Sequence, residues 1–332
     1  MKKLFFTIMA LCLGLSAQAQ NDAMTAILQH GDETSVFKGA SALINAHAAA
    51  EDGDVITLSD GIFTATNITK NLTIYGAGYE TDESSGTTAT EIVGDWQIAT
   101  DSNKPLSDLH IEGVGIKNNF YPCRNASVER FTLNKCHVYG NIGLSKTITG
   151  FIINQCVVDG GIGGSNNIAD NMLICNSIIS QIDNYNFEST IQVDHCIVRN
   201  LLDADYDNTR AIWTNNVFTG SGGSGYMRNV RPYSKVSNCL YVKDAWGNNS
   251  SVDNCTQAGL ADLFADGEDA TYSATRTYEL KQPEAWIGSD GTQIGIHGGS
   301  GFSKIPSTPV VKNLSVEVEG MKLKVTYDAV VR

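Results

Sequence analysis

The residues of this chain that could do chemistry lie close together in its second half. Asp203, Asp205 and Asp207 occupy alternate positions, and carboxylates spaced in this way could present oxygen ligands to Ca²⁺. The run is not an EF-hand loop, because Asn208 and Thr214 stand where that motif needs glycine and glutamate. Two interpretations remain open: a calcium site, and a solvated acidic loop between structural units.

Three arginines, Arg210, Arg228 and Arg231, follow the acidic run. In a Ca²⁺-dependent polyuronate lyase the cation neutralises the uronate carboxylate and acidifies the adjacent carbon-bound proton, which a base then removes. Arginine is a poor base unless its surroundings are unusual, since its free pKa is above about 12. The arginines are candidates for this chemistry, but no complete catalytic constellation accompanies them.

Aromatic residues are interspersed with these charges. They are Tyr206, Tyr226, Tyr233 and Trp246. Ring faces bury apolar area against the CH surfaces of sugar rings, so these residues predict a sugar-binding platform. Core packing and scattered surface aromatics are the alternatives.

A hydrophobic and polar pattern that recurs about every 20 residues must position these side chains. Its most regular column is Cys136, Cys156, Ser177, Cys196, Asn216, Cys239 and Cys255, with steps of 20, 21, 19, 20, 23 and 16 residues. Repeats of this size indicate stacked units that bury an apolar face only together. Asparagine precedes four of these positions, at Asn176, Asn215, Asn238 and Asn254. It suits a turn corner, because it tolerates left-handed backbone and can hydrogen-bond its stacked neighbour.

The opening of the repeat carries a family resemblance. An alanine-rich stretch, 40–50, has Leu43, Ala46 and Ala50 on one helical face. It is followed by Gly-Asp-Val-Ile-Thr-Leu (53–58), Asp-Gly-Ile-Phe (60–63) and Asn-Leu-Thr-Ile-Tyr-Gly-Ala-Gly (71–78). This order, with the Asn-x-Cys rungs, resembles the pectin-lyase-like superfamily over roughly residues 40 to 300. The resemblance implies an all-β, right-handed parallel β-helix, in a superfamily of lyases, hydrolases, epimerases and adhesins.

Family motifs for catalysis are matched only in fragments. Asp194 and His195 resemble part of the Trp-Ile-Asp-His element of one pectate lyase family, but Gln192 and Val193 replace its first two residues. The same register recurs at later rungs, so a structural role accounts for the match. The Arg-x-Pro-x-x-Arg element of such lyases is not matched, because Pro232 follows both arginines. The paired aspartates of the polygalacturonases are also absent from the sequence.

The chain divides into four predicted parts. Residues 1–19 have the basic start, apolar run and small-residue end of a secretory signal peptide. Residues 20–39 form an N-terminal segment, and 40–301 the β-helix with a capping helix at 40–50 over its first edge and 285–296 as its last turn. Residues 302–332 contain a Pro-rich linker and a C-terminal β-hairpin. Because two strands alone are marginal in water, we expect this hairpin to pack on the open end of the solenoid or to dock elsewhere.

Charge and hydropathy exclude some partners. The formal net charge is −13, and removal of the leader with Lys2 and Lys3 makes it −15. Nucleic acid and anionic lipid are poor partners for such a surface, and a polyanionic glycan would need a cation or a basic groove. No later stretch reaches the roughly 18 apolar residues that span a bilayer. We therefore expect an exported protein without membrane insertion, at the cell envelope or outside the cell.

Seven cysteines remain after the leader, which contains Cys12, is removed. Stacked strands lie about 4.8 Å apart, whereas disulfide Cβ atoms prefer about 3.8 Å. We therefore expect the column cysteines to be buried free thiols that act as small hydrophobes. A metal site is the alternative, although the sequence has no Cys-x-x-Cys spacing.

These observations together predict a carbohydrate-interacting β-helix protein that binds a polysaccharide or glycan. A Ca²⁺-dependent polyuronate lyase is the first alternative, with Ca²⁺ as the one cofactor that the sequence suggests. A structural or adhesive surface protein that docks through its C-terminal hairpin is the second. Fold alone does not choose between them.

Overall fold

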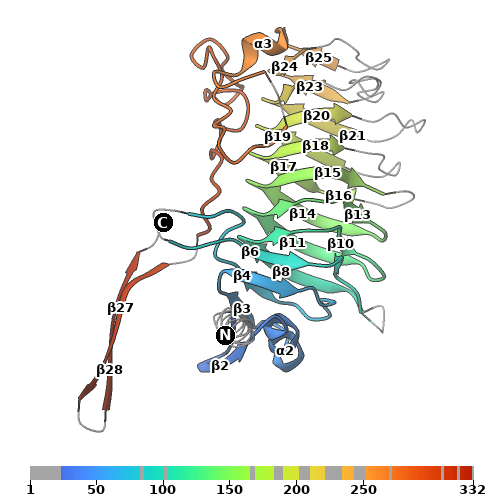
Figure 1. Ribbon diagram of the computed structural model, residues 1–332. Coiled ribbons are helices and arrows are strands. Elements are labelled where there is room, and N and C mark those ends of the chain that lie inside the picture. Colours follow the sequence, from blue (N-terminus) through green and yellow to red (C-terminus); the bar gives the residue numbers. More distant parts are fainter. Residues whose placement is uncertain are drawn as a thin grey trace, which may run out of the picture.

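The computed structural model describes residues 24–82, 86–100, 104–164, 169–182, 190–201, 210–220, 234–242, 251–268, 271–307, 310–319 and 322–330. Two sheets of thirteen strands each stack turn upon turn and enclose one elongated core (Figure 1). Almost all neighbouring strands are parallel, so the predicted all-β parallel β-helix is confirmed. The predicted signal peptide lies outside the described residues.

The first sheet, sheet A, contains the longer strands of most turns. They are β1 (Thr25–His30), β2 (Glu33–Lys38), β3 (Val55–Leu58), β5 (Thr73–Tyr75), β8 (Leu106–Glu112), β11 (Val128–Asn134), β14 (Ile148–Asn154), β16 (Ala169–Asp170), β17 (Met172–Cys175), β19 (Thr190–Asp194), β21 (Arg210–Thr214), β23 (Lys235–Ser237) and β25 (Ser251–Asp253).

The second sheet, sheet B, follows sheet A in each turn after a tight corner. Its strands are β4 (Gly61–Thr64), β6 (Thr90–Val93), β7 (Trp96–Gln97), β9 (Gly115–Ile116), β10 (Phe120–Cys123), β12 (His137–Val138), β13 (Ile142–Leu144), β15 (Val157–Gly163), β18 (Ile178–Ile182), β20 (Ile197–Leu201), β22 (Val217–Phe218), β24 (Leu240–Tyr241) and β26 (Thr256–Gln257).

The predicted column forms the corner between the two sheets. The residue before each column member has a left-handed backbone, with φ of 44° at Asn176, 51° at His195 and 57° at Asn215. Its amide then bonds to the next turn: the N–H of His195 donates to the carbonyl of Thr214 at 3.2 Å. The predicted left-handed corner is therefore confirmed, and it repeats the same bond from turn to turn.

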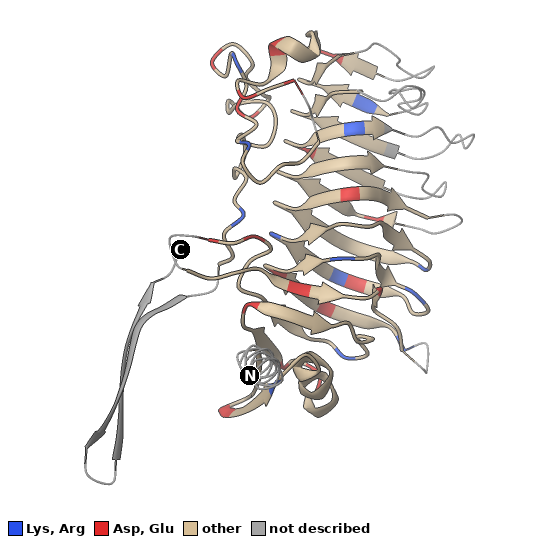
Figure 2. Ribbon diagram, viewed as in Figure 1, with Lys and Arg blue, Asp and Glu red and all other residues tan. Residues whose placement is uncertain are grey.

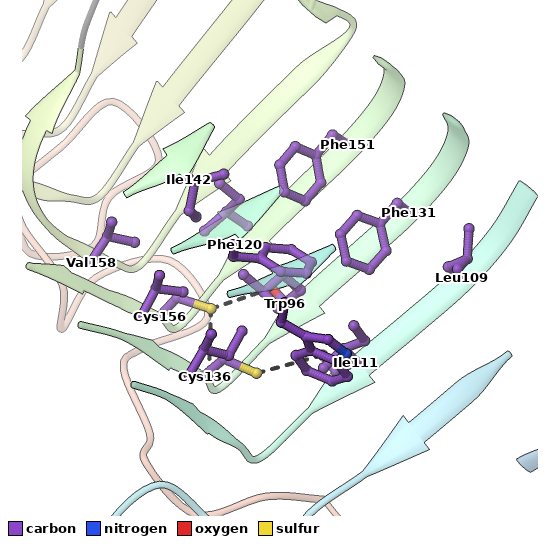
Figure 3. Close-up of a cluster of buried hydrophobic side chains, with 14 of the residues drawn as sticks. Trp96, Leu109, Ile111, Phe120, Phe131, Cys136, Ile142, Phe151, Cys156 and Val158 are labelled. Carbon is purple, nitrogen blue, oxygen red and sulfur yellow. Dashed lines mark hydrogen bonds between the residues drawn. The ribbon is translucent and has the colours of Figure 1, made fainter. Parts of the chain in front are cut away.

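Apolar side chains fill the space between the sheets (Figure 3). The rings of Phe131 and Phe151 stack with centroids 4.9 Å apart, and Trp96 lies 5.9 Å from Phe120. The thiol of Cys136 donates to the carbonyl of Asn134 at 3.1 Å, which satisfies its weak donor inside the stack.

All seven cysteines after the leader are free thiols. The column cysteines 136, 156, 196 and 239 are buried, as predicted. Cys255 is half-buried, because it lies in the turn of β25 and β26, on which no further described strand stacks.

Two elements lie at the N-terminal end of the solenoid. Helix α2 (Ala42–Ala49) turns Leu43 and Ala46 into the core, where Ala50 is also buried. The edge of β3, however, pairs with β1 in antiparallel register, and β2 extends the sheet beyond it. The sequence had predicted the helix at this edge and assigned no strand to residues 20–39.

After β26 the chain turns back and runs along the outside of the stack. This returning segment, residues 258–307, begins with α3 (Leu260–Leu263) and ends with Pro306 beside Gly78 and Gly113 (Figure 1). The stretch 285–296, expected as the last turn, belongs to this segment and lies outside the helix: the amide of Ser289 donates to the Asn215 side chain.

The returning segment packs against the stack because sheet B has a second apolar surface, on its outward face. Of each apolar pair, one residue faces the core, such as Phe218, and the other faces out, such as Val217. The outward row is Ile178, Ile197, Val217 and Leu240, and it packs against Leu263, Phe264, Tyr278, Leu280, Ile294 and Ile296 of the returning segment. Two apolar neighbours in a strand indicate that both faces are covered, because successive side chains point to opposite sides.

The C-terminal hairpin consists of β27 (Val310–Glu319) and β28 (Lys322–Val330), paired in antiparallel register. Because the returning segment carries the chain back, the hairpin projects beside the N-terminal end of the solenoid (Figure 1). The hairpin therefore does not pack on the open end of the solenoid at β25 and β26, which was one of its two predicted positions. Docking to another molecule remains a prediction.

We predict that Phe131→Ala lowers the free energy of unfolding by about 3–5 kcal/mol, because it leaves a cavity in a stacked aromatic row. Urea unfolding followed by circular dichroism measures the change. Val93→Ala, at an exposed position of β6, is the matched control and should cost no more than about 0.5 kcal/mol. Equal losses in the two variants would contradict a core built on this row.

Candidate functional site

The predicted site residues belong to three consecutive connections from sheet B to sheet A. Those outside the described residues are Asp203, Asp205, Asp207, Tyr206, Tyr226, Arg228, Arg231, Tyr233 and Trp246. Arg210 is the first residue of β21, of which the backbone is described. The described strands fix where the three connections begin and end.

These attachment points lie on neighbouring turns along one edge. The strands before the connections are in register at Val198, Phe218 and Tyr241. The strands after them are in register at Ile212, Lys235 and Ser251. Since stacked strands lie about 4.8 Å apart, the topology tethers all the candidate residues to one short stretch of the edge.

The fragment Asp194-His195 lies at the opposite corner, where its geometry resembles an acid, imidazole and hydroxyl relay. His195 Nδ1 is 3.1 Å from Asp194 Oδ1, and its Nε2 is 3.1 Å from the Thr292 hydroxyl. Asp290 Oδ1 lies 3.6 Å from the same Nε2. A hydroxyl beside an imidazole that a carboxylate orients is the arrangement that activates a nucleophile.

Burial and hydrogen bonding assign this group a structural role instead. The Thr292 hydroxyl donates to the Asp290 carboxylate, at 2.9 Å, and accepts the Gly299 amide at 2.7 Å, so its lone pairs and proton are engaged. His195 is 2% exposed, and Gly298 lies so close that a Cβ there would be 2.4 Å from the imidazole. The imidazole therefore fastens the returning segment to the corner.

The two carboxylates beside His195 are held ionised. Burial raises the pKa of Asp194, but hydrogen bonds from His195, Thr214 and Asn215, with the charge of the imidazole, outweigh burial and lower it. Burial also raises the pKa of Asp290, and the amide and hydroxyl of Thr292 outweigh it, so that this pKa is lowered too.

Other corner residues hold the same segment. The Asn176 amide donates to the carbonyls of Ile296, at 3.0 Å, and Gly298, at 2.7 Å, and its oxygen accepts the Ser300 hydroxyl. Gln155 donates to the carbonyl of Gly301 at 2.6 Å. The corner is therefore a docking row for the returning segment as well as a fold element.

This use of the corner changes one sequence prediction. Asn254 donates to its stacked neighbour Asn238, as expected, whereas Asn215 donates at 3.0 Å to Asp194, the residue before its stacked neighbour His195. Asn176 binds the returning segment instead, because that segment passes over its turn. The paired apolar residues of sheet B were the sequence signal that a covering segment exists.

The returning segment ends at a buried carboxylate. Glu112 accepts the amide of Ser307 at 2.5 Å and lies 3.0 Å from His110 Nε2. Burial raises the pKa of Glu112, but the hydrogen bonds from His110, Ser307 and Asn134 outweigh it and lower the pKa to about 2. Nearby, Lys304 pairs with Glu80 at 2.9 Å, and the Tyr272 hydroxyl bonds to the same carboxylate.

Comparisons with known proteins leave the family open. No protein-family model matches the chain, and no curated protein matches it either. Within the described ranges, no group of three or more His, Cys, Asp or Glu residues is placed to hold a metal ion. No helix in the same part of the chain is long and apolar enough to cross a membrane.

Glu112 makes stability depend on acid pH. Its pKa is about 2 in the folded protein against an ordinary 4.5, so its contribution is complete above pH 4.5 and is lost as the pH falls toward 2. We expect this loss to be on the order of 2 kcal/mol. Chemical unfolding at pH 5 and pH 2.5 measures it as the difference between wild type and Glu112→Gln, which cannot ionise. Parallel pH profiles for the two proteins would contradict this role.

Gly298→Ala should detach the returning segment. The added Cβ would lie 1.8 Å from the carbonyl oxygen of Gln293 and 2.4 Å from His195, so the segment must move away. We expect faster proteolytic cleavage within 286–307, measured by mass spectrometry after brief trypsin or chymotrypsin treatment. Gly115→Ala is the matched control, because its Cβ would meet no atom closer than 3.6 Å. Equal cleavage rates in the two variants would show that the corner does not hold the segment.

Proposed function

We propose that this chain is an exported, non-catalytic carbohydrate-binding protein of the cell envelope or the extracellular space, on a β-helix of the pectin-lyase-like kind. One observation carries the proposal. Three neighbouring connections, which together hold four aromatic, three acidic and two basic candidate residues, start and end in register along one edge. Arg210 adjoins them at the start of β21.

The returning segment covers the outward face of sheet B, and this supports a binding site on the side of sheet A. The outward row of sheet B packs under the returning segment, which leaves sheet A and its edge for a long ligand. The outward row of sheet A runs along the stack through Thr132, Ile152, Leu173, Gln192 and Ile212, all half-buried or exposed. A row of small polar and aliphatic groups that leads toward this edge suits an extended, neutral or weakly charged chain molecule.

The chemistry of the connections fits a glycan. Aromatic rings such as Tyr226 and Trp246 would stack on sugar rings, and Arg228 and Arg231 would donate to hydroxyl or carboxylate oxygens. If the glycan is acidic, Ca²⁺ on Asp203, Asp205 and Asp207 would offset the acidic charge of the protein. In the described part, charged residues are scattered along the whole stack (Figure 2). An anionic polymer would therefore have to be attracted by Arg228, Arg231 and any Ca²⁺ on the three aspartates.

The test is retention of the mature protein on a panel of neutral and acidic polysaccharides, with and without Ca²⁺, by affinity electrophoresis. Ultraviolet absorbance of the same mixtures detects the unsaturated uronide that β-elimination makes. We expect retention on at least one glycan and no rise in absorbance. Trp246→Ala should weaken binding about tenfold, which corresponds to about 1.4 kcal/mol.

Tyr121→Ala on β10 is the matched control, because it removes a half-buried aromatic side chain of sheet B rather than of the three connections. It should leave retention unchanged. A calcium-dependent rise in absorbance that Arg228→Ala or Arg231→Ala abolishes would identify a lyase and contradict the proposal. Failure to bind any glycan would also contradict it.

A further inference from the structure

The two ends of the solenoid differ in whether their strand edges are covered by other parts of the chain. At the N-terminal end, β1 and β2 cover the edge of sheet A. The edge of sheet B is covered as well, since the amide of Thr64 donates to the carbonyl of Ala40 at 3.0 Å and that of Ile62 to the Met24 sulfur at 3.3 Å. Natural β-proteins protect edges in this way, because an uncovered edge pairs with other chains.

The C-terminal end has no such cover among the described residues. There β25 pairs with β23 alone and β26 with β24 alone, so each strand has one open edge. Val252 continues the core row of Val193, Trp213 and Val236. Its exposed fraction is 38%, whereas that of Val236 one turn below is 1%. Among the described residues the apolar core is therefore open at this end, although the returning segment, residues 258–307, follows β26 directly.

We propose that the strands β25 and β26 form an interface between two copies of this chain, joined end to end. The edge of β25 is self-complementary. If two copies of β25 pair in antiparallel register about Val252, the two valines meet and extend the core row across the interface. Each Ser251 then faces Asp253 of the second copy, so a hydroxyl can donate to a carboxylate and the two carboxylates stay apart.

A single two-fold axis normal to the sheets gives this arrangement. The same rotation brings the open edges of the two β26 strands toward each other, and Thr256 and Gln257 are both exposed in the single chain. Such an interface is isologous, since each residue contacts its partner reciprocally, and it closes at two copies.

The protected end explains why the assembly stops there. A head-to-tail stack would have to pair β25 with β2, which is exposed and carries Glu33 and Lys38 at its ends. Charged residues on an edge strand oppose further pairing. The structure therefore favours a closed dimer over a growing fibre.

Sedimentation velocity of the full mature chain over a range of protein concentrations tests the proposal. We expect a dimer for the wild type, and a monomer for Val252→Lys, because the new charge would face its own copy across the interface. Val36→Lys is the matched control. Val36 is 57% exposed on β2, so the same change at the protected end should leave the dimer intact.

The register has its own test at Ser251, which is exposed and outside the core. Ser251→Asp places a second carboxylate opposite Asp253 of the other copy and should raise the dissociation constant at least tenfold. Ser251→Lys places a cation there and should lower it. Equal effects of the two variants would overturn the antiparallel register and with it the proposal.

Other results would also overturn it. They are a wild-type monomer at every concentration, a dimer that survives Val252→Lys, and dissociation by Val36→Lys. If Val316→Pro in β27 abolishes the dimer while Val252→Lys does not, the C-terminal hairpin is the docking element instead. These outcomes are independent of glycan retention, which tests the proposed function separately.

Discussion

The stacking of one corner in register is the constraint on which the rest of this structure depends. At each turn a residue in the left-handed conformation gives its amide to the carbonyl of the next turn, as Asn176 does to Asp194 and His195 does to Thr214. A chain held in this way can only repeat itself, because a slip of one residue would turn every inward side chain of the strand outward. The aromatic stack and the thiol column are consequences of that repetition.

The same corner also decides which surfaces remain free. Its side chains bind the returning segment through Gln155, Asn176 and His195, and the outward apolar row of sheet B packs beneath the segment. Apolar burial and hydrogen bonding therefore both hold the returning segment against the stack. Among the described residues, no other segment packs on the outward face of sheet A or on the C-terminal end of the stack, and both proposals concern surfaces on this side of the molecule.

Residues with catalytic potential need not be catalytic in such a scaffold. Asp194, His195 and Thr292 have the contacts of a relay. The Thr292 hydroxyl, however, already donates to Asp290 and accepts the Gly299 amide, and the imidazole is buried under Gly298 and Gly299. A buried polar group must find partners or cost stability, and a corner crossed by a second segment offers them. The Asp-His pair is a fastening for that reason.

The sequence by itself determined the architecture, since a 20-residue period and left-handed corner residues leave few alternatives to a parallel solenoid. It also predicted the buried thiols, the N-terminal helix and the C-terminal hairpin. The course of 258–307 was decided only by tertiary structure. Local patterns report which faces of a strand are apolar, as at Val217 and Phe218, but which distant segment covers them depends on contacts about 75 residues apart, such as Asn215 with Ser289. The candidate residues from 203 to 246 were recognisable by type, whereas their placement on adjacent turns of one edge required the strand register.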